Sequence, residues 1–222
     1  MNGAEGSELV VLTRAPVAGR VMRRLWPALG AAGAARLQAA LLQRLASVTA
    51  SAGYDRVTCR ADDPEHPLLR RLARQSGWCL VAQGTGDLGQ RMAHAFADAW
   101  QRAVRVVLIG SDCPVLEADH LRRARTALAH ADAVLGPAED GGYLLLGLRA
   151  SQPVPFKGVA WGTDRVLAQT RAQLAAAGQR WIELPRLWDL DRPADLDRLW
   201  HLDPPWARDL ARTFAASSRR LG

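Results

Sequence analysis

The chain of 222 residues is 49% hydrophobic and 23% charged, a composition typical of a globular domain and not of a disordered protein. It holds no run of the ~20 apolar residues that a membrane-spanning helix needs, so we expect no membrane partner. The net charge of +7 comes from arginines dispersed over many segments without a nucleic-acid-binding motif, so we expect a solvated basic surface and no nucleic-acid partner.

Short apolar runs alternate with longer helical patterns, which is typical of strand-helix-strand units around a mainly parallel sheet. A continuous apolar run at 106–109 suits a central strand that is covered on both faces. In chain order the patterns predict a strand at 9–13, a helix at 31–51, a strand at 56–60, a helix at 67–75, a strand at 78–82, a helix at 87–102, a strand at 105–110, a helix around 121–128, strands at 133–135 and 143–148, a helix at 163–177, a strand at 181–184, and helices at 193–200 and 204–221.

These elements predict the α/β class, as a three-layer α/β/α sandwich with a mostly parallel, Rossmann-like sheet. No internal repeat or long linker divides the sequence, so we expect a single domain over 1–222, with 203–222 as a C-terminal helical appendage. The first residues do not resemble a signal peptide. Three scattered cysteines do not suggest a disulfide framework, and we therefore expect a cytoplasmic protein.

The first loop, TRAPVAGRVMRRL at 13–25, places proline and glycine in a turn directly after a strand. Arg20, Arg23 and Arg24 follow, and backbone amides beside arginines suit a diphosphate or a triphosphate. The loop has neither the GK[ST] ending of a P-loop nor the GxGxxG of a dinucleotide fold. A basic surface turn explains these residues equally well.

The segment GDLGQRM at 86–92 opens a predicted helix, and Asp87 stands where that helix begins. An aspartate at this position is first of all expected to cap the helix. Gly86 and Gly89 would also let a ligand approach the backbone, and Arg91 would then reach that ligand.

The segment GSDCP at 110–114 directly follows the apolar central strand. Ligands of open α/β sheets bind at the carboxyl ends of the strands. Asp112 at this place either caps the next helix or binds a hard cation, since Mg²⁺ is held by one or two carboxylates plus substrate phosphates. Cys113 suits a small buried residue better than a nucleophile, because no histidine lies near it in the sequence.

The segment GPAEDGGYLLLG at 136–147 places Glu139 and Asp140 before two glycines and a strand. The Asp-Gly-Gly sequence is typical of a hairpin turn. Acidic residues at a strand entrance would also receive substrate hydroxyls or act as a general base. Both interpretations remain open at this point.

The segment WDLDRPADL at 188–196 carries Asp189 and Asp191 ahead of Pro193, which suits the first turn of a helix. One of the two aspartates is expected to cap that helix. The other would complete a metal site with Asp112, provided that the fold brings them together.

The order and spacing of these segments together are specific. From about Leu9 to Leu199 the chain resembles a bacterial transferase family of the nucleotide-diphospho-sugar transferase (GT-A) fold, whose members are labelled arsenosugar-biosynthesis or radical-SAM/selenodomain-associated glycosyltransferases. More distantly it is similar to 2-phospholactate guanylyltransferases. The resemblance rests on TRAPVAGRV, GDLGQRM, VVLIGSDCP, GPAEDGGYLLLGL, DLDRPADL and the segment Trp161-Gly162-Thr163.

The resemblance implies one site that these segments build together. A divalent metal, Mg²⁺ or Mn²⁺, would be held by Asp112, with Asp191 as a second ligand. The catalytic residues would be Asp140 and Arg24. The nucleotide would contact Ala15, Pro16, Gly19, Arg20, Asp87, Arg91 and Ser111. The transferred group or the acceptor would contact Gly141, Gly142, Tyr143, Trp161 and Thr163.

Two lysines that relatives carry in the first loop are replaced here by Arg14 and Met22. Met22 removes a charge, and nucleotidyl transfer needs cations around the attacked phosphate. This loss disfavours nucleotidyl transfer unless Arg23 or Arg24 substitutes.

We therefore expect a metal-dependent glycosyltransferase that moves a sugar from a nucleotide-sugar donor to a small-molecule acceptor. One alternative is a nucleotidyltransferase that couples an NTP to a small phosphorylated metabolite. Another is a nucleotide-binding protein without catalysis. The tail beyond Leu202 suits a homodimer contact or a lid, and the tryptophans of the C-terminal third suggest a buried aromatic surface there.

Overall fold

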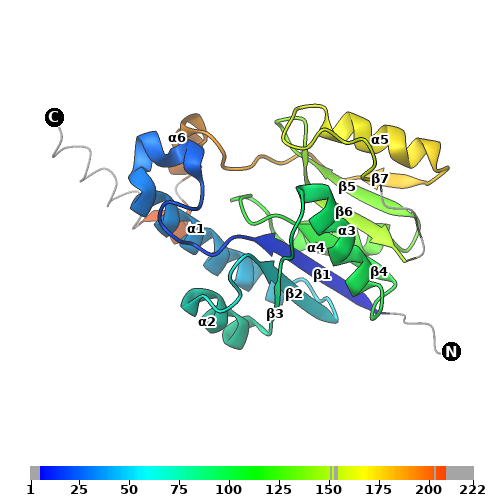
Figure 1. Cartoon of the computed structure of the whole chain (residues 1–222), viewed down its shortest axis with the longest axis horizontal. Coiled ribbons are helices and arrows are strands. Elements are labelled where there is room, and N and C mark those ends of the chain that lie inside the picture. Colours follow the sequence, from blue (N-terminus) through cyan, green and yellow to red (C-terminus); the bar gives the residue numbers. More distant parts are fainter. Residues whose placement is uncertain (1–5, 151, 153–154, 203, 209–222) are drawn as a thin grey trace.

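The computed structural model describes residues 6–150, 152, 155–202 and 204–208. A seven-stranded sheet in the order β3-β2-β1-β4-β6-β5-β7 carries helices on both faces (Figure 1). The strands are β1 (Ser7–Thr13), β2 (Arg56–Ala61), β3 (Cys79–Ala82), β4 (Arg105–Ile109), β5 (Ala133–Pro137), β6 (Tyr143–Arg149) and β7 (Trp181–Glu183). The helices are α1 (Trp26–Ala50), α2 (Pro67–Ser76), α3 (Leu88–Ala99), α4 (Ala118–Ala127), α5 (Val166–Ala176) and α6 (Pro193–Leu202), with 3-10 helices η1 (Arg23–Leu25) and η2 (Pro205–Ala207).

The sheet is mostly parallel, as the sequence predicts. The pairs β1–β2, β1–β4, β2–β3 and β5–β7 are parallel. Strand β6 is antiparallel to both β4 and β5. The reason is the short Asp-Gly-Gly turn between β5 and β6, because only an antiparallel pair can be closed by so tight a connection. The hairpin interpretation of this segment is confirmed.

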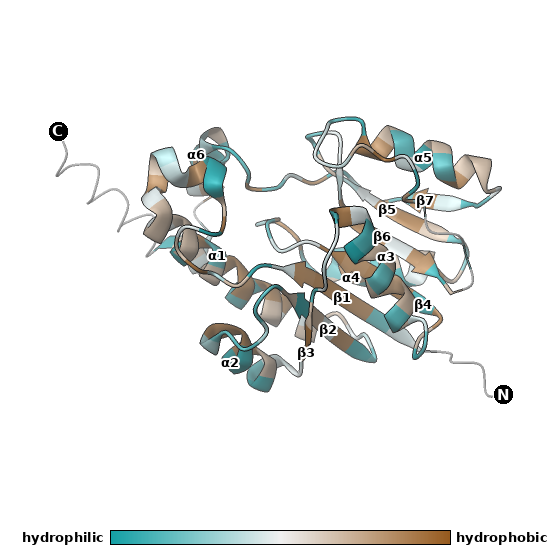
Figure 2. Cartoon of the chain, viewed as in Figure 1, coloured by the Kyte–Doolittle hydropathy of each residue, from teal (hydrophilic) through white to brown (hydrophobic). Residues whose placement is uncertain are grey.

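The three layers explain the continuous apolar run of β4. Val107 and Ile109 pack under α1, α2 and α4, whereas Val106 and Leu108 face α3 and α5. Successive side chains of a strand point to opposite faces, so a strand covered on both faces needs apolar residues throughout. Figure 2 accordingly shows apolar colouring along β1 and β2 inside the sheet and polar colouring on parts of the outer helix α2.

Helix α1 begins before the predicted start at residue 31 and changes direction at Gly30, where φ is 66° and ψ is 166°. Glycine adopts this positive φ without steric cost, and the regular helix continues from the next residue. The first turns of α1 lie beside α6 (Figure 1). A small apolar cluster joins the two, with Leu37 of α1 and Leu196 and Leu199 of α6 among its members.

The predicted helix at 204–221 is described only at 204–208, where the 3-10 helix η2 forms; the remainder of that helix, and of the appendage predicted over 203–222, lies outside the described residues. Within the described residues no helix combines the length and apolarity that crossing a membrane requires.

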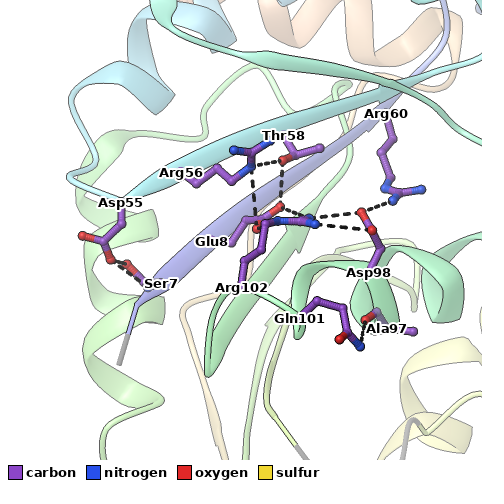
Figure 3. A network of polar contacts seen from close by, with 10 residues as sticks. All are labelled: Ser7, Glu8, Asp55, Arg56, Thr58, Arg60, Ala97, Asp98, Gln101 and Arg102. Atoms are coloured by element: carbon purple, nitrogen blue, oxygen red, sulfur yellow. Dashed lines mark hydrogen bonds and ion pairs between the residues drawn. The ribbon is translucent and has the colours of Figure 1, made fainter. Parts of the chain in front are cut away.

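A buried polar network holds the amino end of β1, at the end of the sheet opposite to the carboxyl ends of the parallel strands. Glu8 is fully buried, and its carboxylate accepts hydrogen bonds from the guanidinium of Arg102 at 3.1 and 3.2 Å and from the Thr58 hydroxyl at 2.7 Å (Figure 3). Asp98 bridges Arg102 to Arg60, and these hydrogen bonds, with Arg102 as the largest cause, lower the pKa of Asp98. The network pairs a buried charge with donors, so loss of one partner is costly.

Candidate active site

A cavity of about 660 Å³ opens at the carboxyl ends of β1, β3 and β4, next to the start of the antiparallel strand β6. This is the edge at which open α/β sheets bind ligands. The cavity is lined by Leu12, Thr13, Arg14, Arg20, Val21, Met22, Arg23, Arg24, Gln38, Gln83, Leu88, Arg91, Met92, Leu108, Gly110, Ser111, Asp112, Asp140, Gly142, Tyr143, Leu144, Trp161, Gly162, Thr163, Val166, Asp189, Leu190 and Asp191.

The first loop brings four arginines to one wall of the cavity. Asp62, which follows β2, holds this loop: its carboxylate accepts the Ala15 N–H at 2.7 Å and pairs with Arg20 at 3.3 Å. Met22 precedes η1 with φ 46° and ψ 47°, and it is the only non-glycine residue of the described chain with a positive φ. A left-handed backbone conformation is unfavourable for such a side chain, and non-glycine residues that adopt it are often found at functional sites. Asp62 thus holds the loop at Ala15 and Arg20, and the backbone is strained at Met22, where the loop enters η1.

A backbone hydrogen bond brings the distant aspartates together. The Leu190 N–H donates to the Asp112 carbonyl at 3.0 Å, while the chain just before it pairs with the end of β5. This contact places Asp189 and Asp191 on either side of Leu190 at the carboxyl end of β4. The fold therefore brings the segment that carries Asp189 and Asp191 to Asp112.

The carboxylates of the cavity repel one another. Burial raises the pKa of Asp112, and the nearby charges of Asp191 and Asp140 raise it further. Burial is also the largest cause for Asp189, followed by Asp112 and Asp140, and together they raise its pKa to about 7. Arg24 forms an ion pair with Asp191. Four acidic side chains thus share this part of the cavity with one closely paired arginine.

The excess of negative charge in this part of the cavity would be neutralised by a divalent metal ion. In the described part of the chain, no three histidine, cysteine, aspartate or glutamate side chains are grouped to hold a metal ion by themselves. Mg²⁺, however, is typically held by one or two carboxylates and by substrate phosphates. Asp112 together with Asp191 or Asp189 fits that incomplete ligand set, and the arginines of the first loop line the same cavity.

Asp140 lies on the β5–β6 turn and also lines the cavity, so the two interpretations of its segment are compatible. Its Oδ1 accepts the Gly142 N–H at 2.8 Å, which leaves Oδ2 for a ligand. Gly141 has φ +90°, and a Cβ there would meet the Asp164 carbonyl oxygen at 2.3 Å. Gly141 therefore shapes the turn that presents Asp140.

The opposite wall is aromatic. Trp161 packs edge-on against Tyr143 at 6.5 Å and against Phe156 at 5.7 Å between ring centroids. Its indole lies over the first turn of α3, where a Cβ on Gly89 would come within 2.5 Å of Trp161 Nε1. Gly89 is thus required for this wall, in which Trp161 and Tyr143 present flat apolar rings to the cavity.

A buried hydrogen-bond network beside the cavity was not expected from the sequence. Gln38 of α1 is buried, and its Nε2 donates to the hydroxyls of Thr13 at 3.2 Å and Ser111 at 3.0 Å. Sequence reasoning overlooked Gln38 because it stands in an alanine- and leucine-rich helix; the signal was a polar residue on the apolar face. Gln83 was likewise not among the predicted site residues, whereas Asp189 was one of the two aspartates left open as a second metal ligand.

The structure places most predicted site residues on the cavity wall, and their roles remain predictions. Asp87 is exposed and caps α3, with a capping box to Gln90, so its cap role is confirmed. Cys113 is buried, and burial raises the pKa of its thiol to about 12, which fits a small packed residue. On the wall lie Arg20, Arg24, Arg91, Ser111, Asp112, Asp140, Gly142, Tyr143, Trp161, Thr163 and Asp191; away from it lie Ala15, Pro16, Gly19, Asp87 and Gly141.

Neither predicted aspartate caps α6. The carboxylate of Asp195, inside the helix, accepts the N–H groups of Asp191 at 3.0 Å and Arg192 at 2.7 Å. The Asp189 side chain is thereby left to face the cavity, and that of Asp191 to face both the cavity and Arg24.

Comparison with known proteins shows the family to which the chain belongs. The model of a family described as an uncharacterized protein conserved in bacteria (DUF2064) matches residues 44–163, more than half of the chain. A search of curated proteins found no match.

Solved structures share the fold. A putative nucleotide-diphospho-sugar transferase from Desulfovibrio desulfuricans G20 is 29% identical, with a TM-score of 0.83, over 97% of this chain and 98% of that chain. A nucleotidyl transferase from Methanothermobacter thermautotroptrophicus is 16% identical, with a TM-score of 0.59, over 93% of this chain and 98% of its own. A CMP:2-keto-3-deoxy-manno-octonic acid synthetase complexed with CTP is 11% identical, with a TM-score of 0.55, over 89% of this chain and 98% of its own. The expected nucleotide-diphospho-sugar transferase fold is confirmed.

Proposed function

Because the chain belongs to the DUF2064 family and has the nucleotide-diphospho-sugar transferase fold, we propose that it is a metal-dependent glycosyltransferase that takes a nucleotide-sugar donor. The observation that carries the proposal is the convergence, in one cavity, of the first-loop arginines with four aspartates. The 29%-identical D. desulfuricans protein, described as a putative nucleotide-diphospho-sugar transferase, supports the same donor class.

The donor's diphosphate would lie between the two charged walls. Arg20 and Arg23 would contact phosphate oxygens from the first loop, with charge-assisted hydrogen bonds. Asp112 and Asp191 would hold the divalent cation, which when bound supplies positive charge to the departing nucleoside diphosphate. Arg24, which is paired with Asp191, stands where it would contact the same phosphates.

The acceptor would lie against the aromatic wall. Tyr143 and Trp161 offer an apolar surface beside the turn that carries Asp140. The free carboxylate oxygen of Asp140 would take the proton of an acceptor hydroxyl as that hydroxyl attacks the anomeric carbon of the donor sugar. The bond between the anomeric carbon and the diphosphate breaks in the same step, and the nucleoside diphosphate leaves.

A second candidate, nucleotidyl transfer, is favoured by one observation. Arg23 and Arg24, which line the cavity, would supply the charge that Met22 removes. Cations so placed would stabilise an attacked α-phosphate, and the released product would then be pyrophosphate.

The released product separates the two candidates. The test incubates the protein and Mg²⁺ or Mn²⁺ with panels of nucleotide-sugars and NTPs, each together with a panel of small hydroxyl-bearing and phosphorylated acceptors, and measures nucleoside diphosphate and pyrophosphate in parallel. Metal-dependent release of nucleoside diphosphate supports the proposal, release of pyrophosphate from an NTP supports the second candidate, and neither product contradicts both.

A matched pair of variants tests whether Asp140 acts as the general base. Asp140→Asn is expected to lower turnover by about 100-fold, the contribution of one general base. Glu139→Gln is the control, because Glu139 is exposed and pairs with Arg198 at 2.7 and 3.1 Å instead of lining the cavity. Equal rates for the two variants would remove Asp140 from the proposed chemistry.

A further inference from the structure

The first loop and the segment that leads into α6 meet in one apolar cluster beside the cavity. Leu25, directly after Arg24, and Leu190, directly before Asp191, are both buried in that cluster. Met22, whose backbone is left-handed, packs against the cluster from the loop. The backbones of Arg24 and Asp191 are thus held at fixed positions by their buried neighbours, and the ion pair between the two side chains is part of the fold.

Arg24 neutralises one of the four cavity aspartates. Its Nη1 donates to Oδ2 of Asp191. This hydrogen bond and the charge of Asp191 raise the pKa of Arg24, and the charges of Asp140 and Asp189 raise it further. The guanidinium therefore lies in the field of three carboxylates and occupies an oxygen that a divalent cation at Asp112 and Asp191 would need.

The head of the Arg24 side chain remains free to move. The side chain is 64% exposed, and Asp191 is the one hydrogen-bond partner of its guanidinium within the described part of the chain. A guanidinium carries further N–H donors, which suit phosphate oxygens. The neighbouring arginines are placed differently, since Arg20 pairs with Asp62 at 3.3 Å and Arg23 lies over the Trp26 ring at 5.8 Å.

We propose that Arg24 is an exchangeable counter-ion: without nucleotide it pairs with Asp191, and when the donor's phosphates bind it moves onto them and frees Asp191 for the divalent cation. The proposal rests on the proposed function, because it needs a nucleotide donor and a cation in one cavity. Arg24 and the cation compete for the same carboxylate, so a ligand that draws Arg24 away raises the affinity for the cation. By linkage the cation raises the affinity for the phosphates by the same factor.

The first experiment measures Mn²⁺ binding without nucleotide, from the electron paramagnetic resonance signal of free Mn²⁺. Arg24→Gln should bind Mn²⁺ about 3- to 10-fold more tightly than the wild type, because Asp191 is no longer paired. Arg23→Gln is the control, since it removes the same charge from the next residue, which has no ion pair with a cavity aspartate among the described residues. It should change the Kd of Mn²⁺ by less than about 2-fold.

The reciprocal experiment measures the Kd of inorganic pyrophosphate by titration calorimetry in chelator. Asp191→Asn should bind pyrophosphate about 3- to 10-fold more tightly than the wild type, because Arg24 is released to the anion. Asp197→Asn removes the same charge from an exposed position of α6 outside the cavity and should bind as the wild type does. Introduced into Arg24→Gln, the Asp191→Asn change should gain less than about 2-fold, since no arginine is then released.

Two results would overturn the exchange and leave the proposed function standing. The first is an Arg24→Gln variant that binds Mn²⁺ no more tightly than Arg23→Gln. The second is a gain in pyrophosphate affinity from Asp191→Asn that is the same with and without Arg24, because the gain would then come from lost repulsion alone. A wild type and variants that bind neither Mn²⁺ nor any nucleotide would contradict the proposed function as well.

Discussion

Replacing Asp189 by asparagine should stabilise the protein in the absence of ligand, and increasingly so as the pH rises. The pKa of Asp189 is raised to about 7, mainly by burial and then by Asp112 and Asp140. In the unfolded chain the carboxyl ionises near its ordinary value of about 3.9. A folded-state pKa above the unfolded value means that the associated stability is complete below about pH 4 and is lost progressively until about pH 7. Asparagine keeps the shape and carries no charge, so it avoids this loss.

The magnitude follows from the separation of the two pKa values. A difference of about three pH units corresponds to at most about 4 kcal/mol of unfolding free energy, since each unit is worth about 1.4 kcal/mol. About 1.5 kcal/mol of that loss has accumulated by pH 5 and the remainder by pH 8. The cavity is open to water, which screens the charges, so we expect the stability difference between Asp189→Asn and wild type to widen by about 1–2.5 kcal/mol between these pH values.

Urea unfolding, followed by tryptophan fluorescence at pH 5, 6, 7 and 8 with a chelator present, measures this difference directly. Asp197→Asn is the control, because Asp197 is an exposed aspartate on α6 outside the cavity. Its difference from wild type should not vary with pH over this range. A stability difference for Asp189→Asn that is the same at pH 5 and pH 8 would show that burial and the acidic neighbours do not raise the pKa of Asp189.

Three further substitutions test other parts of the structure. Glu8→Ala should lower the unfolding free energy by about 1–3 kcal/mol, because the buried Thr58 hydroxyl loses its acceptor while Arg102 keeps Asp98; a loss under about 0.5 kcal/mol in urea unfolding contradicts this. Gly141→Ala should lower the melting temperature and reduce turnover, since its Cβ would clash with the Asp164 carbonyl at a positive φ; unchanged melting would show that the turn adapts. Asp112→Asn should weaken nucleoside diphosphate binding in Mg²⁺ to the level of the wild type in chelator, measured by calorimetry; wild-type affinity would place the metal elsewhere.

Local patterns were sufficient to predict the layers of this fold. Apolar runs located each strand, and the Asp-Gly-Gly turn marked the hairpin that makes β6 antiparallel. Local patterns did not predict the start of α1, because Gly30 lets the chain form a turn of helix, bend and continue. Element type thus follows from local periodicity, whereas its boundary depends on one backbone angle.

The candidate site was predictable where one segment carries its own signal. Asp112 follows a buried strand, and Asp140 precedes a glycine turn, so both could be singled out from the sequence. Gln83 gained its interest only through Arg91, a contact that no local pattern indicates. The sequence left open which of Asp189 and Asp191 would reach Asp112, and the Leu190–Asp112 hydrogen bond carries both to the cavity. Such long-range contacts have no local pattern.

The most direct test of the central claim, that the cavity binds a nucleotide together with a divalent cation, is a thermal-shift screen of the wild-type protein. Nucleotide-sugars, nucleoside diphosphates and NTPs are each added with Mg²⁺, with Mn²⁺ and with chelator, since a ligand that binds only the folded state raises its melting temperature. Stabilisation by a nucleotide-sugar and by its nucleoside diphosphate is expected only when metal is present. Stabilisation that is equal in chelator, or no response to any nucleotide, would contradict a metal-dependent nucleotide site.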